Sequence, residues 1–223
     1  MHRKEHPIRQ LAIFDLDGTV IDSMWAWKNV SEELLERYNI VPDDDIKARL
    51  NRITLKGAAE LFIEHYHLDK DADTLIQELC DIVADKYHNV VGLKEDIVVF
   101  LDYLKQQNIR MCIATACNLE LAKAALIRLN IIDYFEFILT CDELNTTKHS
   151  PLIYEVAAAR LGGSAENATV YEDSLHTVIT AKKAGFEVIA IHDEWEAGNH
   201  ELIAEHSDKF IHAYRELIPC AGE

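Results

Sequence analysis

The sequence has no hydrophobic run long enough to cross a bilayer. A membrane-spanning helix needs about 20 mostly apolar residues, and no stretch of the 223-residue chain approaches that length. The first ten residues, MHRKEHPIRQ, are basic but contain no apolar signal core. Secretion is therefore not expected, and we predict a cytoplasmic protein that does not associate with membranes.

Basic residues are scarce. The chain has 22 Lys and Arg against 39 Asp and Glu, which gives a formal net charge of −17. Nucleic-acid binding depends on clustered Lys and Arg side chains, so this deficit argues against a nucleic-acid partner. A small phosphorylated substrate is still possible, because a bound cation can reverse the local field.

Cysteines are few and show no pairing pattern. The five cysteines are odd in number and none are in CxxC spacing, which favours reduced thiols in a cytosolic protein. Cys117 alone lies near the motifs described below, and we expect a core or loop position for it rather than catalysis. The composition, 49% hydrophobic and 27% charged, is that of a globular chain able to hold a core domain and a smaller insert.

The most informative segment is LAIFDLDGTVIDS at residues 11–23. An apolar strand from Leu11 to Phe14 runs directly into Asp15 and Asp17, followed by Gly18-Thr19. Open parallel sheets bind ligands at the carboxyl ends of their strands. One carboxylate there can attack phosphorus while its neighbour handles a proton, and both lie within reach of one metal ion. The alternative is a strand followed by an Asx/Gly turn with solvated carboxylates.

The rest of the chain divides by its periodicity. Residues 24–90 show helical spacing with breaks near Pro42 and Asp69, which predicts a helical insert of about 70 residues and four helices. From about residue 95 strands alternate with helices. The expected strands are 110–115, 137–140, 169–171 and 187–191; the expected helices are 94–107, 119–129, 150–161 and 175–184, before a weaker helix–strand pair at 199–212. This alternation predicts a parallel sheet with helices on both faces.

The motif DxDGTVxDS resembles the signature of the haloacid dehalogenase superfamily, in the branch with a helical cap that includes β-phosphoglucomutases and phosphoglycolate phosphatases. The resemblance implies an α/β fold: a Rossmann-like, doubly wound parallel sheet with an inserted α-helical cap. The core would comprise residues 1–22 and 92–223, and the cap residues 23–91. The cap would then leave the core just after the two aspartates and could fold over them.

The resemblance also assigns roles to the acidic residues. Asp15 would be the nucleophile and Asp17 the general acid and base. The Asp15 carboxylate, the Asp17 backbone carbonyl and Asp173 would bind Mg²⁺, with Glu172 binding directly or through water. Hard oxygen ligands at strand ends suit Mg²⁺, which takes only one or two carboxylates. By themselves, Glu172 and Asp173 could equally be acids at a solvated helix N-terminus.

Two further strand ends would hold the phosphoryl group. Thr115 ends the strand in IATACN, where the family has a Ser or Thr that can hydrogen-bond a phosphoryl oxygen. Asn118 and the backbone of Ala116 are secondary candidates. Lys148 matches the family lysine that holds nucleophile and phosphate, although here Pro151 comes two residues later than in the common Lys-Pro form.

Two histidines adjoin these motifs. His149 follows Lys148, and His176 follows the Glu172-Asp173 pair by three residues. Either could touch substrate, although histidines beside acidic sites are more often surface residues. Their spacing does not support a zinc site.

In the helical insert, Trp27 and Arg49 are candidate substrate-binding residues. Trp27 could instead pack the cap, and Arg49 could lie on a solvated helix face. The resemblance implies a Mg²⁺-dependent phosphatase of small phosphorylated metabolites, working through an aspartyl-phosphate, as a monomer or homodimer. A β-phosphoglucomutase-like sugar phosphomutase is the main alternative; that group has a histidine about ten residues after the second Asp, where this chain has Trp27. A non-catalytic binding protein with the same fold is a third reading.

Overall fold

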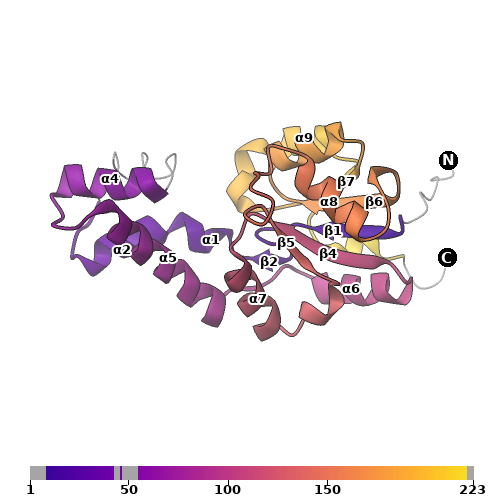
Figure 1. Ribbon diagram of the computed structural model, residues 1–223, viewed down its shortest axis with the longest axis horizontal. Helices are drawn as coiled ribbons and strands as arrows, with labels where there is room; N and C mark the ends of the chain where they lie inside the picture. Colours follow the sequence, from indigo (N-terminus) through magenta and orange to yellow (C-terminus); the bar gives the residue numbers. More distant parts are fainter. Residues whose placement is uncertain (1–8, 43–45, 47–54, 220–223) are drawn as a thin grey trace. The chain divides into compact units, whose positions relative to one another are not determined.

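The computed structural model describes residues 9–42, 46 and 55–219. Six strands form one parallel sheet in the order β5-β4-β1-β6-β7-β8 (Figure 1). The strands are β1 (Leu11–Phe14), β4 (Arg110–Thr115), β5 (Ile138–Thr140), β6 (Ala168–Glu172), β7 (Glu187–Ile191) and β8 (Lys209–Ile211). All four residues of β1 are buried, as expected of a central strand covered on both faces.

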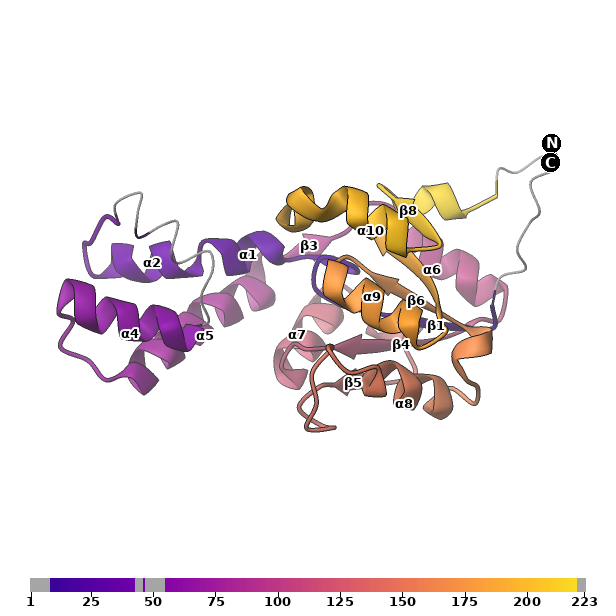
Figure 2. The same ribbon diagram turned by 90° about the horizontal axis from the view of Figure 1, so that it is seen from above.

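Helices cover both faces of the sheet. The helices of one face are α8 (Leu152–Arg160), α9 (Leu175–Lys183) and α10 (His200–His206), and their core contains Ile13, Val170, Val188, Ile153 and Val178. On the other side are α6 (Ile97–Gln106) and α7 (Leu119–Arg128) (Figure 2). The rings of Phe14 and Tyr171 stack on this side, with their centroids 4.3 Å apart. The predicted doubly wound α/β fold is thus confirmed.

Several element boundaries differ from those expected. Helix α6 begins at Ile97 rather than residue 94, because Asp96 has a left-handed φ of +60° that a helix cannot include. Strand β6 extends to Glu172, one residue beyond its expected end. The 3₁₀ segments, which the sequence did not predict, are η1 (Ile132–Tyr134), η2 (Ala165–Asn167), η3 (Glu194–Asn199) and η4 (Tyr214–Leu217).

A second, two-stranded ladder was also missed. The strands β2 (Ile21–Asp22) and β3 (Gly92–Leu93) pair antiparallel. Two-residue strands are too short to show an alternating pattern in the sequence. This ladder joins the chain just after the aspartate motif to the segment that leads into α6.

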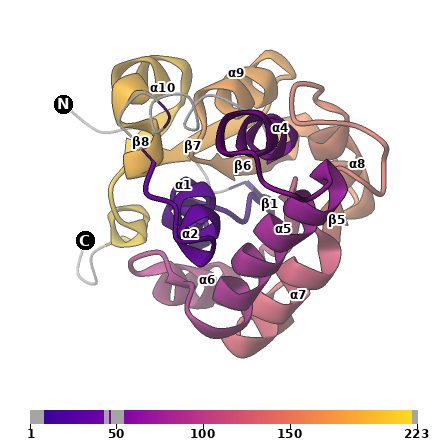
Figure 3. The same cartoon turned by 90° about the vertical axis from the view of Figure 1, so that its left-hand side faces the viewer.

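The chain divides into two compact units, with boundaries after Asp22 and before Gly92. The described part of the second unit contains four helices, α1 (Met24–Lys28), α2 (Val30–Arg37), α4 (Leu55–Tyr66) and α5 (Ala72–Asn89), as Figure 3 shows. Helix α5 packs against both α2 and α4. Its buried residues Leu75, Leu79, Ile82 and Val83 recur at the helical spacing seen in the sequence.

Among the described residues, no helix combines the length and the apolar character that a membrane crossing requires.

Candidate active site

The candidate site lies where β4, β1 and β6 end side by side. Phe14 pairs with Ile113 on one side and Tyr171 on the other. Asp15 directly follows β1 and therefore lies beside Glu172. The backbone N–H of Asp15 donates to the Tyr171 carbonyl at 3.0 Å. Strand order thus brings together residues more than 150 positions apart.

The glycine of the aspartate motif makes the turn after β1. Gly18 has φ +78°, a conformation that L side chains rarely adopt. Its N–H donates to the Ile21 carbonyl at 2.9 Å, and the Ile21 N–H donates to the Leu16 carbonyl at 3.0 Å. This tight turn keeps Asp17 partly buried, in an isolated bridge with Ile21.

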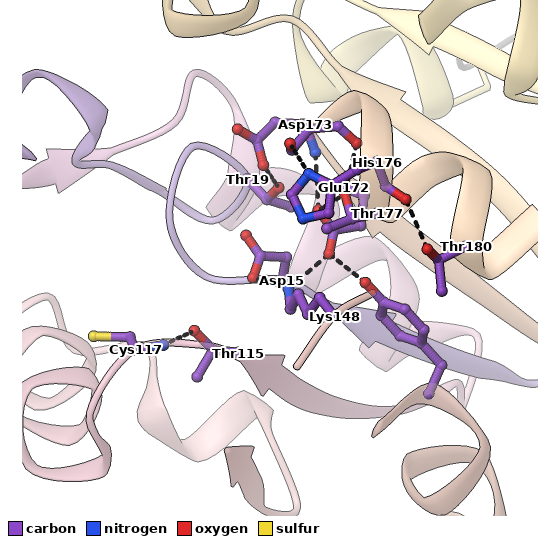
Figure 4. Close-up of polar contacts among 12 residues, drawn as sticks. Asp15, Thr19, Thr115, Cys117, Lys148, Glu172, Asp173, His176, Thr177 and Thr180 are labelled. Carbon is purple, nitrogen blue, oxygen red and sulfur yellow. Dashed lines mark hydrogen bonds and ion pairs between the residues drawn. The ribbon is translucent and has the colours of Figure 1, made fainter. Parts of the chain in front are cut away.

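Lys148 is the cation of the site. Its ammonium group forms ion pairs with Asp15 Oδ1 and, at 2.6 Å, with Glu172 Oε1. All three side chains are buried. Lys148 therefore reaches the nucleophile candidate even though Pro151 is displaced from the common Lys-Pro position (Figure 4).

Glu172 is held by donors that sequence reasoning missed. The Tyr154 hydroxyl donates to Glu172 Oε1 at 2.7 Å, and the Asp173 N–H reaches Oε2 at 3.3 Å. The Thr177 hydroxyl lies 2.9 Å from Oε2 and 2.6 Å from the Ser174 carbonyl, so it shares one hydrogen between two acceptors. Glu172 is 1% exposed. Because it ends β6, its side chain points toward α8 and α9, where no sequence motif indicates partners.

Asp173 is the third buried carboxylate. Thr19, the last residue of the DLDGT motif, donates its hydroxyl to Asp173 Oδ1 at 3.2 Å. The carboxylate oxygens of Asp15, Glu172 and Asp173 come within 4.8 Å of one another. Among the described residues, the second oxygens of Asp15 and Asp173 have no hydrogen-bond partner, whereas both oxygens of Glu172 are engaged.

The electrostatics indicate a shortage of positive charge. The pKa of Asp15 is raised to about 8, chiefly by burial. The charge of Lys148 lowers this pKa, whereas the charges of Glu172 and Asp17 raise it further. Burial, then Asp15 and Glu172, raise the pKa of Asp173 well above its usual range. Burial alone would lower the pKa of Lys148, but Asp15 and Glu172 outweigh it and raise the pKa.

This donor set fits a hard divalent cation. Buried carboxylates whose pKa values are raised by one another favour an added positive charge. Asp15 and Asp173 each offer a carboxylate oxygen that no described residue occupies. Oxygen donors of this kind are the ligands that Mg²⁺ takes in proteins.

The phosphate-binding candidates lie at the end of β4. Thr115 is fully buried, and its hydroxyl oxygen accepts the Cys117 N–H at 2.9 Å. Asn118 Oδ1 accepts the Glu120 N–H at 2.9 Å and thereby caps the N-terminus of α7. Ala116 is exposed. Cys117 is buried and is not part of a disulfide, as expected.

The cap candidates belong to the helical unit. The Trp27 indole N–H donates to the Tyr87 hydroxyl at 2.9 Å, which ties α1 to α5 within the helical unit. Arg49 lies outside the described residues.

The two histidines adjoining the site contact each other. The ring centroids of His149 and His176 are 4.6 Å apart, with 36° between the planes. His176 Nδ1 lies 2.9 Å from the Ser174 hydroxyl oxygen. Both rings are exposed at the surface.

Comparison with known proteins gives matches over most of the chain. Residues 12–191 match the sequence profile of the family described as haloacid dehalogenase-like hydrolase. The chain is 26% identical over 187 residues to validoxylamine A 7'-phosphate phosphatase of Streptomyces hygroscopicus subsp. limoneus, covering 82% of this chain and 85% of that protein. It is 30% identical over 196 residues to phosphoglycolate phosphatase of Neisseria gonorrhoeae, covering 79% and 77%.

The fold has close structural neighbours. The crystal structure of CbbY from Rhodobacter sphaeroides in complex with phosphate superimposes with a TM-score of 0.75 at 22% identity. The superposition covers 94% of this chain and 96% of that one.

Proposed function

Because the chain belongs to the haloacid dehalogenase-like hydrolase family, we propose that it is a Mg²⁺-dependent phosphatase that hydrolyses a small phosphorylated metabolite. One observation carries the proposal: Asp15, at the end of β1, pairs with a buried lysine and lies within a cluster of three carboxylates. The names of the relatives, sugar-type and phosphoglycolate phosphatases, support the substrate class.

In the proposed mechanism a carboxylate oxygen of Asp15 attacks the phosphorus of a monoester, and an aspartyl-phosphate forms as the ester bond breaks. Asp17 gives its proton to the departing alkoxide and then takes one from the water that hydrolyses the intermediate. The buried Lys148 ammonium and the Thr115 hydroxyl stabilise and orient the transferring group.

Asp15, Asp173 and the Asp17 backbone carbonyl would hold Mg²⁺. Glu172, whose oxygens are already engaged, would position Lys148 and act on the ion through water. When bound, Mg²⁺ supplies the positive charge that lets two carboxylates face a phosphate dianion. We propose residues 1–22 and 92–223 as the catalytic core domain and residues 23–91 as the helical cap domain.

The decisive experiment is Asp15→Asn. The amide is nearly isosteric but cannot act as the nucleophile, so phosphate release from p-nitrophenyl phosphate with Mg²⁺ should fall at least about 10³-fold. Asp133→Asn, at an exposed aspartate of η1, is the matched control and should keep wild-type activity. A wild type with no turnover, or an Asp15→Asn variant as active as wild type, would contradict the proposal and favour a non-catalytic binding protein.

The same assay separates the phosphatase from a sugar phosphomutase. An indole cannot act as a general acid or base at neutral pH, and the N–H of Trp27 donates to the Tyr87 hydroxyl. We therefore expect phosphate release to exceed isomerisation of a sugar 1-phosphate. Isomerisation without phosphate release would show that the enzyme is a mutase.

A further inference from the structure

The His149–His176 pair lies beside the proposed catalytic groups but has no part in the mechanism above. His149 directly follows Lys148, and His176 is in the first turn of α9, which begins just after Asp173-Ser174. Among the charges that act on the pKa of His176 are those of Glu172 and Lys148. The ring of His176 is therefore within electrostatic reach of the site, and it is exposed at the same end of the sheet.

The hydrogen bonds around His176 fix which ring nitrogen carries the proton. The Ser174 hydroxyl has one hydrogen and donates it to the Glu196 carboxylate at 2.9 Å. Its oxygen therefore accepts in the 2.9 Å contact with His176 Nδ1, so Nδ1 must carry the hydrogen. Asn199 holds the other Glu196 oxygen at 2.6 Å, which keeps this carboxylate in place.

His149 supports the same protonation state. Burial and the neighbouring His149 ring, in that order, lower the pKa of His176 below its usual value. A lowered pKa favours the neutral imidazole, in which Nδ1 is the donor and Nε2 an acceptor. Packing of the His149 ring at 4.6 Å restricts how the His176 plane can turn.

We propose that His176 Nε2 accepts a hydrogen bond from a hydroxyl group of the leaving alcohol, so that the enzyme prefers phosphomonoesters of polyhydroxy alcohols, such as sugars and polyols, over phosphoglycolate. This inference rests on the proposed phosphatase function. An acceptor nitrogen binds an alcohol O–H but offers nothing to a carboxylate oxygen, which is itself an acceptor. An enzyme discriminates strongly against a substrate that leaves a hydrogen-bonding group of its site unpaired.

The test compares phosphomonoesters whose alcohol part carries hydroxyls, a carboxylate or neither. The monophosphates of ethylene glycol, glycerol and a hexitol carry hydroxyls; phosphoglycolate carries a carboxylate; ethyl phosphate carries neither. Wild type should give the highest kcat/KM with at least one hydroxyl-bearing ester. His176→Phe, which keeps a ring but removes Nε2, should raise KM for that ester about five- to tenfold with little change in kcat. Ethyl phosphate should be unaffected, as should every substrate in the control His206→Phe, at an exposed histidine of α10.

The outcomes distinguish this inference from the proposed function. If no substrate releases phosphate, the phosphatase proposal fails. If ethyl phosphate is hydrolysed in an Asp15-dependent manner but His176→Phe leaves the hydroxyl preference unchanged, only the role of His176 is wrong. An independent readout is the ¹⁵N NMR spectrum of the His176 ring: Nε2 must be unprotonated at pH 7, and a protonated Nε2 would overturn the proposal.

Discussion

Glu172 joins more of the candidate site than any other single side chain. Its two oxygens contact Lys148, Tyr154, Thr177 and the Asp173 N–H. Hydrogen bonds to both oxygens of a buried carboxylate fix its rotamer. Glu172 thereby fixes Lys148, and Lys148 in turn holds one oxygen of Asp15. Groups that orient metal ligands in this way commonly affect metal affinity as strongly as activity.

Tyr154→Phe tests this role. The substitution removes only the hydroxyl that donates to Glu172 Oε1 at 2.7 Å. We expect the Mg²⁺ concentration for half-maximal activity to rise about tenfold. Tyr171→Phe is the matched control, because Tyr171 is also a buried core tyrosine but its hydroxyl bonds to no described residue. An unchanged Mg²⁺ requirement in Tyr154→Phe would contradict a positioning role for this hydroxyl.

At the scale of elements, the start of α5 carries a well-defined cap. Asp71 Oδ1 accepts the Thr74 N–H at 2.8 Å, and Oδ2 accepts the Thr74 hydroxyl at 2.8 Å. The Thr74 backbone and side-chain donors, in that order, lower the pKa of Asp71. Helix α5 packs against α1, α2 and α4, so the stability of its first turn affects the whole helical unit.

Asp71→Ala should lower the melting temperature and speed hydrogen exchange at the Thr74 amide, because the first turn of α5 loses its acceptor. Asp71→Asn keeps an acceptor oxygen and should lie close to wild type. The folded-state pKa is depressed below 3.8, so the stabilisation is present above that pH and is lost as pH falls through the folded pKa. The difference between wild type and Asp71→Ala should therefore shrink in acid; a difference that does not change with pH would show that the charge of Asp71 adds nothing to the cap.

For the whole molecule, part of the excess negative charge is buried, where it is most costly. A chain of net charge −17 buries three carboxylates around one lysine. The folded pKa of Asp15, about 8, is far above its ordinary value of 3.8. Between these two values the unfolded chain binds fewer protons than the folded one, so the stability of the metal-free protein contributed by Asp15 is lost as pH rises toward 8.

Mg²⁺ should reverse this loss, since it binds only the folded arrangement of ionised carboxylates. The melting temperature in Mg²⁺ should exceed that in EDTA by more at pH 8.5 than at pH 5.5. In Asp15→Asn the excess at pH 8.5 should shrink, because the amide does not titrate. Thermal unfolding followed by circular dichroism measures both; a Mg²⁺ effect independent of pH would show that ionisation of Asp15 is not linked to metal binding.

Much of the fold could be predicted from the sequence because it depends on local pattern. The buried run Leu11–Phe14 and the alternation after residue 95 indicate a covered parallel sheet, and the structure has it. Glycine at position 18 is required by a turn of positive φ. The two-residue strands β2 and β3 could not be found, since their pairing depends on segments about 70 residues apart.

The sequence by itself determined which chemical groups are available: two aspartates after a buried strand, a lysine, a threonine and an acidic pair. Only the tertiary structure decided which of them meet. Strand order places the ends of β1 and β6 side by side, and one further residue of β6 turns Glu172 toward Tyr154 and Thr177. The tertiary structure also brings the rings of His149 and His176 into contact. Contacts between distant segments follow from sheet topology and side-chain direction, which no local spacing in the sequence encodes.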